Sequence, residues 1–350
     1  MKALDKRWVL IGSALLIVVL LVLPFLVKNY RVFQFNLVLV YAIAILGLNI
    51  LTGFNGQISL GHGAFYAFGA YTAAVLMDKA GVPYWATLPA AGVVCFGFGF
   101  LVGFPALRLA GHYLALATYA LALAVPQLLK YKRIESLTGG VQGIVLSKPE
   151  APFSFSLFGQ PLSADRWLYF FTLVVAALIF LLAWNLLRGR VGRALIAVRD
   201  HPIAATAMGI NLPMFKSLAF GVSAAFTGVA GALGAIVVAF VSPDSFTVTL
   251  SIFMLVGVVV GGLASIPGAI FGAIFIQFVP NISDALSKSA PQAIYGVFLI
   301  GMMYLMPGGV MGMVHRVWAR LRRGTPGSPG QRAPVQAVSS EAVEPLPRKV

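Results

Sequence analysis

The chain has 350 residues, of which 59% are hydrophobic and only 10% are charged. Because a soluble domain carries about 25% charged residues, this composition excludes an ordinary soluble enzyme and is typical of a polytopic membrane protein. The 25 Lys and Arg residues lie mostly at the ends of apolar segments and in the C-terminal tail, so a positive-inside bias explains the net charge of +15 and nucleic-acid binding is not expected.

Ten apolar segments long enough to cross a bilayer follow one another along the chain. The first, residues 8–27, follows a basic stretch and lacks the small-residue cleavage site of a secretory signal, so we expect a retained helix. The sequence therefore predicts an all-α polytopic integral membrane protein with about ten transmembrane helices, some short or broken by Gly and Pro. The other nine segments are residues 32–51, 57–77, 84–106, 108–130, 166–187, 217–241, 248–263, 264–281 and 292–310.

The distribution of charge predicts the direction of these helices. With residues 1–7 as a basic cytoplasmic N-terminus, an even number of spans returns the C-terminus to the cytoplasm. The transmembrane domain then covers residues 8–315, and residues 316–350 form a tail that is first basic and then Pro-rich and disordered. The same alternation makes the connection 131–165 external and the Arg-rich connection 188–216 cytoplasmic.

Few groups in the chain could carry out chemistry. No Gly-Lys dipeptide occurs, so the chain has no Walker A loop and cannot hydrolyse ATP alone. Cys95 is the single cysteine, which excludes an intrachain disulfide, and the histidines lack the spacing of a metal site. We therefore expect no enzyme activity, metal or cofactor of its own, with an intramembrane enzyme or an assembly scaffold as the alternative from another class.

One apolar segment, residues 53–71, carries a cluster of polar side chains among several glycines. A polar group that faces lipid without a partner costs several kcal/mol, whereas a broken, Gly-rich helix can supply polar groups to a transport path. We predict that Asn55, Gln57, Ser59 and His62 line such a path. For His62, the two flanking glycines leave open a structural role beside a close helix contact.

A second broken segment, residues 257–277, contains Ser265 and Pro267. We include Ser265 in the predicted translocation path. Close helix packing is nevertheless the favoured role of this segment as a whole, because Gly-x-x-x-Gly pairs let helix backbones approach. The pairs are Gly257 with Gly261 and Gly268 with Gly272.

The cytoplasmic connection contains a pattern typical of a short capped helix. Asp200 is a candidate N-cap, Pro202 falls in the first turn and Gly209 follows the last turn. An Ala-rich helix flanked by Arg suits a groove in a soluble partner, although a loop held by anionic lipid explains the same charges. The candidate coupling residues are Gly192, Arg193, Arg199, Asp200, Ala204, Ala205 and Gly209.

Several stretches resemble one known family in their order along the chain. The segment around Ala204-Ala205-x-x-x-Gly209 is similar to the cytoplasmic loop by which ABC importer permeases engage their ATPase. Together with the stretches below, it resembles the membrane permeases of branched-chain amino acid ABC importers, of the LivM type, over about residues 31–315. The stretches are residues 52–65 (TGFNGQISLGHGAF), 108–115 (RLAGHYLA), 137–143 (LTGGVQG), 242–246 (SPDSF), 261–268 (GGLASIPG) and 305–309 (LMPGG).

The resemblance implies a non-enzymatic permease subunit in the bacterial inner membrane. Its implied partners are cytoplasmic ATPase subunits, which bind the ATP, a sister permease subunit in a heterodimer, an external solute-binding protein and the lipid bilayer. Two departures bear on the site: Ile203 replaces the Glu that importers carry before Ala-Ala, and Phe253 stands where relatives often carry an acid. The alternatives are an ABC permease for another small solute, such as urea, amides or aromatic acids, and an autonomous secondary carrier.

Overall fold

The computed structural model describes residues 19–106, 109, 111–152, 156–157, 160–288 and 290–322. The predicted N-terminal segment 1–7, most of the first span 8–27 and most of the tail 316–350 lie outside these residues. The chain divides into two compact units, Met1–Met313 and Val314–Val350. The account below concerns the first unit, which holds every predicted site residue.

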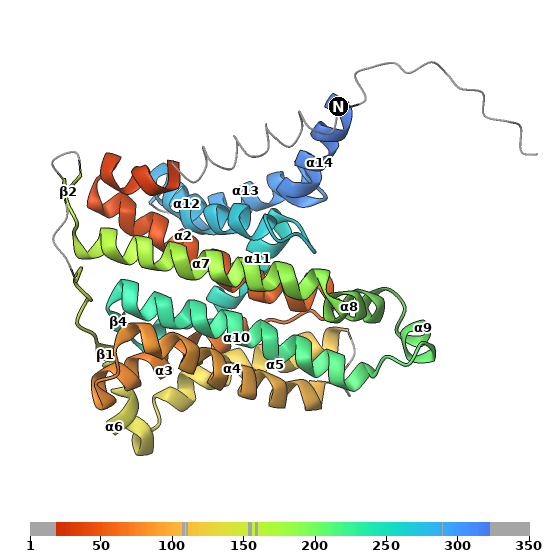
Figure 1. The fold of residues 1–350 in the computed structure, drawn as a ribbon, viewed down its shortest axis with the longest axis horizontal. Coiled ribbons are helices and arrows are strands. Elements are labelled where there is room, and N and C mark those ends of the chain that lie inside the picture. The colour runs from red at the N-terminus through yellow and green to blue at the C-terminus, as the bar shows by residue number, and fades with distance from the viewer. Residues whose placement is uncertain are drawn as a thin grey trace, which may run out of the picture. The chain divides into compact units, whose positions relative to one another are not determined.

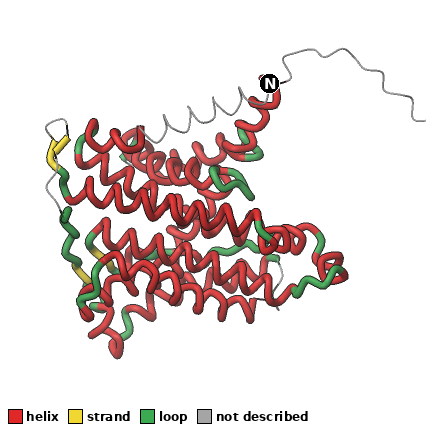
Figure 2. Tube along the Cα trace, viewed as in Figure 1, coloured by secondary structure: helices red, strands yellow, loops and turns green. Residues whose placement is uncertain are grey.

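Helices make up most of the described chain (Figure 1, Figure 2). Residues 19–26 are helical, and the long helices that follow are α2 (Asn29–Asn49), α3 (His62–Ala80), α4 (Tyr84–Ala106), α5 (His112–Leu129), α7 (Ala164–Arg188), α10 (Leu212–Val238), α11 (Val248–Gly261), α12 (Gly268–Leu286), α13 (Pro291–Leu305) and α14 (Gly309–Arg322). The shorter elements are the π-helix η1 (Ile50–Phe54), the 3-10 helices η2 (Lys132–Ile134) and η3 (Pro243–Ser245), the helices α6 (Glu135–Thr138), α8 (Arg190–Asp200) and α9 (Pro202–Ala207), and the strands β1 (Ile144–Val145), β2 (Ser156–Leu157), β3 (Gln160–Pro161) and β4 (Phe240–Val241).

Eight helices within the described residues are long and apolar enough to cross a membrane. They overlap eight of the ten predicted segments, and the chain is a multi-pass membrane protein. Of the other two segments, 8–27 is described only from residue 19, and 57–77 corresponds to α3, which is not among the eight. The eight spans are Asn29–Phe54, Tyr84–Pro105, His112–Leu129, Ala164–Arg188, Leu212–Val238, Pro243–Gly261, Gly268–Leu286 and Pro291–Val317.

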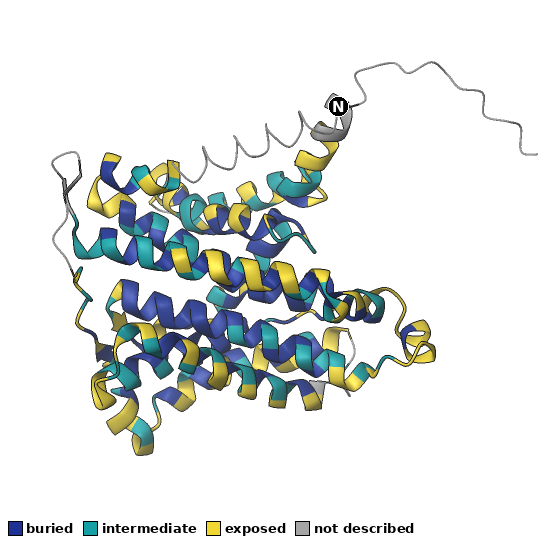
Figure 3. Cartoon of the chain, viewed as in Figure 1, coloured by how far each residue is buried: buried dark blue, intermediate teal, exposed yellow. Residues whose placement is uncertain are grey.

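Helix α10 forms the centre of the bundle and packs against α2, α3 and α4. Its residues from Ala230 to Val237 are all buried, and Figure 3 shows buried residues gathered around it while the outer helices carry exposed ones. Glycines make this close packing possible: a Cβ at Gly69 of α3 would collide with the backbone of Gly228 on α10. In a membrane, where lipid tails are as apolar as leucine, such backbone contact is a main source of helix association.

The two long connections lie at opposite ends of this bundle (Figure 1). At one end, β1 pairs antiparallel with β4, with Ile144 opposite Val241, and so ties the 131–165 connection to the end of α10. At the other end lie α8 and α9 of the 188–216 connection. Their placement on opposite sides of the membrane stays a prediction.

Candidate translocation and coupling site

The helical structure is interrupted between α2 and α3. The π-helix η1 ends at Phe54, and α3 begins only at His62, five residues later than the start of the predicted span 57–77. Gly56 has φ +74, a backbone conformation that L side chains rarely adopt, and it turns the chain out of helical geometry. Because irregular backbone at membrane depth is tolerated only where protein or a cavity satisfies it, the partners of residues 55–61 decide the role of this segment.

His62 is completely buried, and both of its ring nitrogens have partners. Nε2 lies 2.6 Å from Oγ of Ser223 on α10, and Nδ1 lies 3.0 Å from Oγ of Ser59. The Ser223 hydroxyl donates to the carbonyl of Gly47 on α2 at 2.6 Å. Since a hydroxyl has one hydrogen to give, Ser223 accepts from His62, so the proton of the ring is on Nε2 and Nδ1 accepts from Ser59. His62 therefore joins α2, α3 and α10.

Backbone groups beside His62 are satisfied in the same way. The Gly63 N–H donates to Oγ of Ser251 on α11 at 2.8 Å. The Leu60 N–H donates to Oγ1 of Thr118 on α5 at 3.0 Å. The helix entry at residues 59–63 is thus fixed by side chains from three other helices.

Asn55 and Gln57 differ from their neighbours, because they are buried without partners. They are 3% and 7% exposed, and neither the Asn55 amide nor Nε2 of Gln57 has a hydrogen-bond partner among the described residues. Buried polar groups in native proteins are almost always paired with protein or water. Both residues lie beside a pocket, which has room for such a partner.

This pocket has a volume of about 190 Å³ and lies where residues 55–58 meet helices α8 and α9 of the 188–216 connection, which is called the candidate coupling segment below. Asn55, Gly56 and Gln57 form one wall, and Val198, Arg199 and Pro202 of α8 and α9 form another; the remaining lining residues are Ile58, Leu109, Gly111, Leu114 and Lys216. Asn55 and Gln57 of the predicted path are therefore brought together with Arg199 of the predicted coupling residues, although about 140 residues separate them.

The coupling segment folds as two helices instead of one. Asp200 is not an N-cap: it ends α8, and His201 precedes α9 with φ −146 and ψ 87. The reason is Pro202, since a residue before proline is driven out of helical geometry. Gly209 follows α9 with φ +82, in the position that the sequence indicated.

The side chains of this segment divide between the bundle and the exterior. Gly192 of α8 lies against the backbone of Leu187, and Ala205 is buried. Arg193 and Ala204 are exposed. On α9 and just after it, Ile203 is 88% exposed and Met208 is 84% exposed. Helix α9 lies beyond the ends of the neighbouring helices in Figure 1.

Ser265 and the four predicted packing glycines lie at the hairpin of α11 and α12. A Cβ at Gly261 would meet the carbonyl of Gly268, and one at Gly272 would meet the carbonyl of Gly257, so the two helix backbones are in contact. Oγ of Ser265 accepts from the Gly268 N–H at 3.2 Å and thereby caps α12.

Sequence reasoning missed Asn49, which joins this hairpin to α2. Its Oδ1 accepts from the Ala264 N–H and its Nδ2 donates to the Ser265 carbonyl, both at 2.9 Å. The available signal was one polar residue near the end of a largely apolar span, whose other amide side chains, Gln34 and Asn36, lie near its start. Ser223, Ser251 and Thr118 were missed for the same reason, because an isolated Ser or Thr in a membrane helix has no distinctive pattern.

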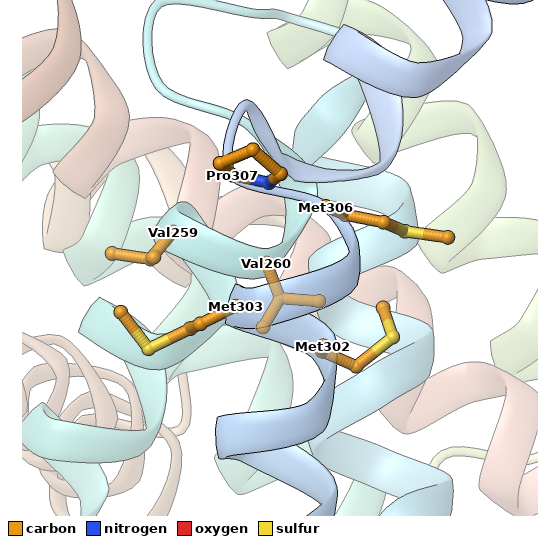
Figure 4. A pocket seen from close by; sticks show the side chains of 6 residues that line it. All are labelled: Val259, Val260, Met302, Met303, Met306 and Pro307. Atoms are coloured by element: carbon orange, nitrogen blue, oxygen red, sulfur yellow. The ribbon is translucent and has the colours of Figure 1, made fainter.

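A separate cavity of about 50 Å³ lies between α11 and the end of α13. Figure 4 shows the side chains that line it, all of which are apolar: Val259, Val260, Met302, Met303, Met306 and Pro307. These side chains offer no hydrogen-bond partner to a polar solute, so the pocket beside Asn55 is the better candidate site.

Comparison with known proteins places these features in one family. Residues 31–307 match the family model described as the branched-chain amino acid transport system permease component. The chain belongs to this family. The matched region contains the polar segment, the α11–α12 hairpin and the coupling segment of this permease, and the resemblance to LivM-type permeases is confirmed.

Individual relatives agree with the family match. The permease is 36% identical over 336 residues to the high-affinity branched-chain amino acid transport system permease protein LivM of Escherichia coli (strain K12). This alignment covers 90% of this chain and 78% of that protein. It is 35% identical to LivM of Salmonella typhimurium, over 85% of this chain and 74% of that protein. The protein LivH of Escherichia coli (strain K12) is 27% identical over 78% of this chain and 91% of its own length. No solved structure matches the chain.

Proposed function

We propose that this permease forms part of the membrane path of an importer that carries branched-chain amino acids across the bacterial inner membrane, with ATP hydrolysed on separate subunits. The observation that carries this proposal is the pocket in which the unpartnered Asn55 and Gln57 meet α8 and α9. A transporter whose ATP is hydrolysed on a separate subunit needs contact between its solute path and the segment that binds that subunit. This pocket would provide such a contact.

Within this proposal, Asn55 and Gln57 contact the solute, because the Asn55 amide and Nε2 of Gln57 have no partner among the described residues and can bind it. Ser59 and His62 keep the broken segment in shape, because their polar atoms are already paired. Ser265 shapes the α11–α12 hairpin beside the path through its bond to Gly268.

The proposed partners follow from the two ends of the bundle and from the relatives. Ile203 on α9 and Met208 just after it are exposed apolar side chains that an ATPase groove would bury. The similarity to both LivM and LivH proteins supports pairing with a sister permease of the LivH type. An external solute-binding protein would dock at the end that carries residues 131–165. Both termini and residues 188–216 are then cytoplasmic, and the predicted ten spans fit this orientation.

Reconstitution in liposomes tests the proposal. Uptake of labelled leucine is measured with the permease, its copurifying ATPase, the sister permease and the binding protein. We expect uptake that needs ATP and all partners, and that unlabelled isoleucine and valine reduce. If urea, amides or aromatic acids reduce the uptake and isoleucine and valine do not, the solute belongs to another class. Uptake by this chain alone would support an autonomous carrier instead.

A further inference from the structure

The coupling helix α8 contacts the end of the membrane helix that leads into the path. Arg199 Nη1 donates to the Gly53 carbonyl in η1 at 2.8 Å. The last carbonyls of a helix have no partner within it, and a cation is favoured at this negative end of the helix dipole. Arg199 therefore caps the α2–η1 helix from a position 146 residues further along the chain.

A second contact fixes the same pair of elements. Gly56 lies against the aliphatic part of Arg199: a Cβ placed on Gly56 would come within 2.8 Å of Cγ and 3.5 Å of Cβ of Arg199. On its other side, Arg199 Nε donates to Oδ1 of Asp200 at 2.8 Å, which orients the guanidinium. The arginine is thus held by its own helix and holds the segment that carries Asn55 and Gln57.

The helix end that Arg199 caps also contacts the α11–α12 hairpin. A Cβ on Gly53 would collide with the backbone of Ala264, so the two backbones touch. Asn49, one turn earlier, bonds Ala264 and Ser265 through its amide. A shift of Gly53 would therefore displace this hairpin as well as the pocket wall. The π-helical turn between Asn49 and Asn55 is the kind of irregularity often found at functional sites.

We propose that Arg199 is a positioning residue that makes α8 and residues 53–57 move as one body. Force applied at α9 by a bound partner then reaches the pocket wall at Asn55 and Gln57 through the Arg199–Gly53 bond. The inference rests on the proposed function, since it assigns the route by which ATP hydrolysis elsewhere would change the path. It differs from a docking role, because Arg199 acts through its bond to Gly53.

Arginine variants in the complete reconstituted transporter test the proposal. Arg199→Met keeps the aliphatic stem against Gly56 and removes the donor to Gly53. We expect solute uptake per ATP hydrolysed to fall about tenfold, as for loss of one charge-assisted hydrogen bond, while ATPase recovery with the complex stays unchanged. Arg199→Lys should restore part of this ratio. Arg31→Met, an arginine at the start of α2, is the matched control and should leave the ratio unchanged.

A designed disulfide provides the second measurement. The 3.5 Å separation between the added Cβ and Arg199 Cβ suits a disulfide, and Cys95, the single native cysteine, is buried. The double variant Gly56→Cys, Arg199→Cys loses the arginine when reduced, so its uptake per ATP should be low. Oxidation should raise it again, because a covalent link replaces the Arg199–Gly53 bond. Each single variant should show no response to oxidation.

The outcomes separate this inference from the function on which it rests. A wild-type complex without ATP-driven uptake contradicts the proposed function. With an active wild type, the Arg199 inference is overturned by an unchanged ratio in Arg199→Met, by a loss of ATPase from its complex, or by a cross-linked pair whose uptake stays low.

Discussion

His62 Nε2 lies 2.6 Å from Ser223 Oγ, and this contact joins the start of α3 to the central helix α10. The Ser223 hydroxyl donates a hydrogen bond to the Gly47 carbonyl on α2, so this one hydroxyl links three helices inside the bundle.

Replacing Ser223 by Ala should destabilise the permease by about 1–3 kcal/mol, because the His62 N–H and the Gly47 carbonyl would both lose a buried partner. Ser217 on the same helix is the matched control: its hydroxyl is buried with no partner among the described residues, so Ser217→Ala should change stability little. Thermal unfolding of the two detergent-solubilised variants would show the difference. Equal unfolding temperatures would contradict the proposed network.

Gln57→Ala should lower leucine uptake about three- to tenfold, since it removes a hydrogen bond to the solute or to water held with it. Assembly with the partners, measured by copurification, should not change. Asn36→Ala offers a control of the same kind, because the Asn36 amide is also buried and has no partner in the part of the chain that the structure describes, but it does not line the pocket. If both variants transport equally well, Gln57 does not contact the solute.

Gly261→Ala should destabilise the protein by about 1–3 kcal/mol, because its new methyl group would meet the Gly268 carbonyl and push α11 from α12. The same change at Gly301 of α13 meets nothing within 4 Å and should be tolerated. Unfolding temperature again reports the effect. A tolerated Gly261→Ala would mean that the hairpin can open without loss of stability.

Replacing Ile203 and Met208 together by Ser should reduce ATPase recovery at least tenfold, since burying each of these side chains contributes about 1.5–3 kcal/mol. Val145→Ser, an exposed residue at the opposite end of the bundle, serves as the control and should leave recovery unchanged. Copurification from membranes measures both. Full recovery with the double variant would show that the ATPase binds elsewhere.

Sequence periodicity and composition predicted much of the fold. Eight of the predicted apolar segments coincide with helices able to span a membrane, because a bilayer demands long uncharged runs that are visible in one dimension. Helix α8 was not predicted, although Val191, Leu195 and Val198 recur at helical spacing. The helix-end signals at Pro202 and Gly209 indicated a helix only after Asp200.

The candidate site could be predicted only in part. The sequence by itself determined that the chain crosses a membrane, that Asn55, Gln57, Ser59 and His62 form a polar cluster along one segment, and that Gly209 follows the end of α9, because burial cost and backbone geometry act on neighbouring residues. Only the tertiary structure decided which members of the cluster are paired: Ser223 completes the His62 bonds, whereas the Asn55 amide and Nε2 of Gln57 have no partner within the described part of the chain. It also decided that Arg199 reaches Gly53, since hydrogen bonds between residues far apart in the chain depend on how the helices pack.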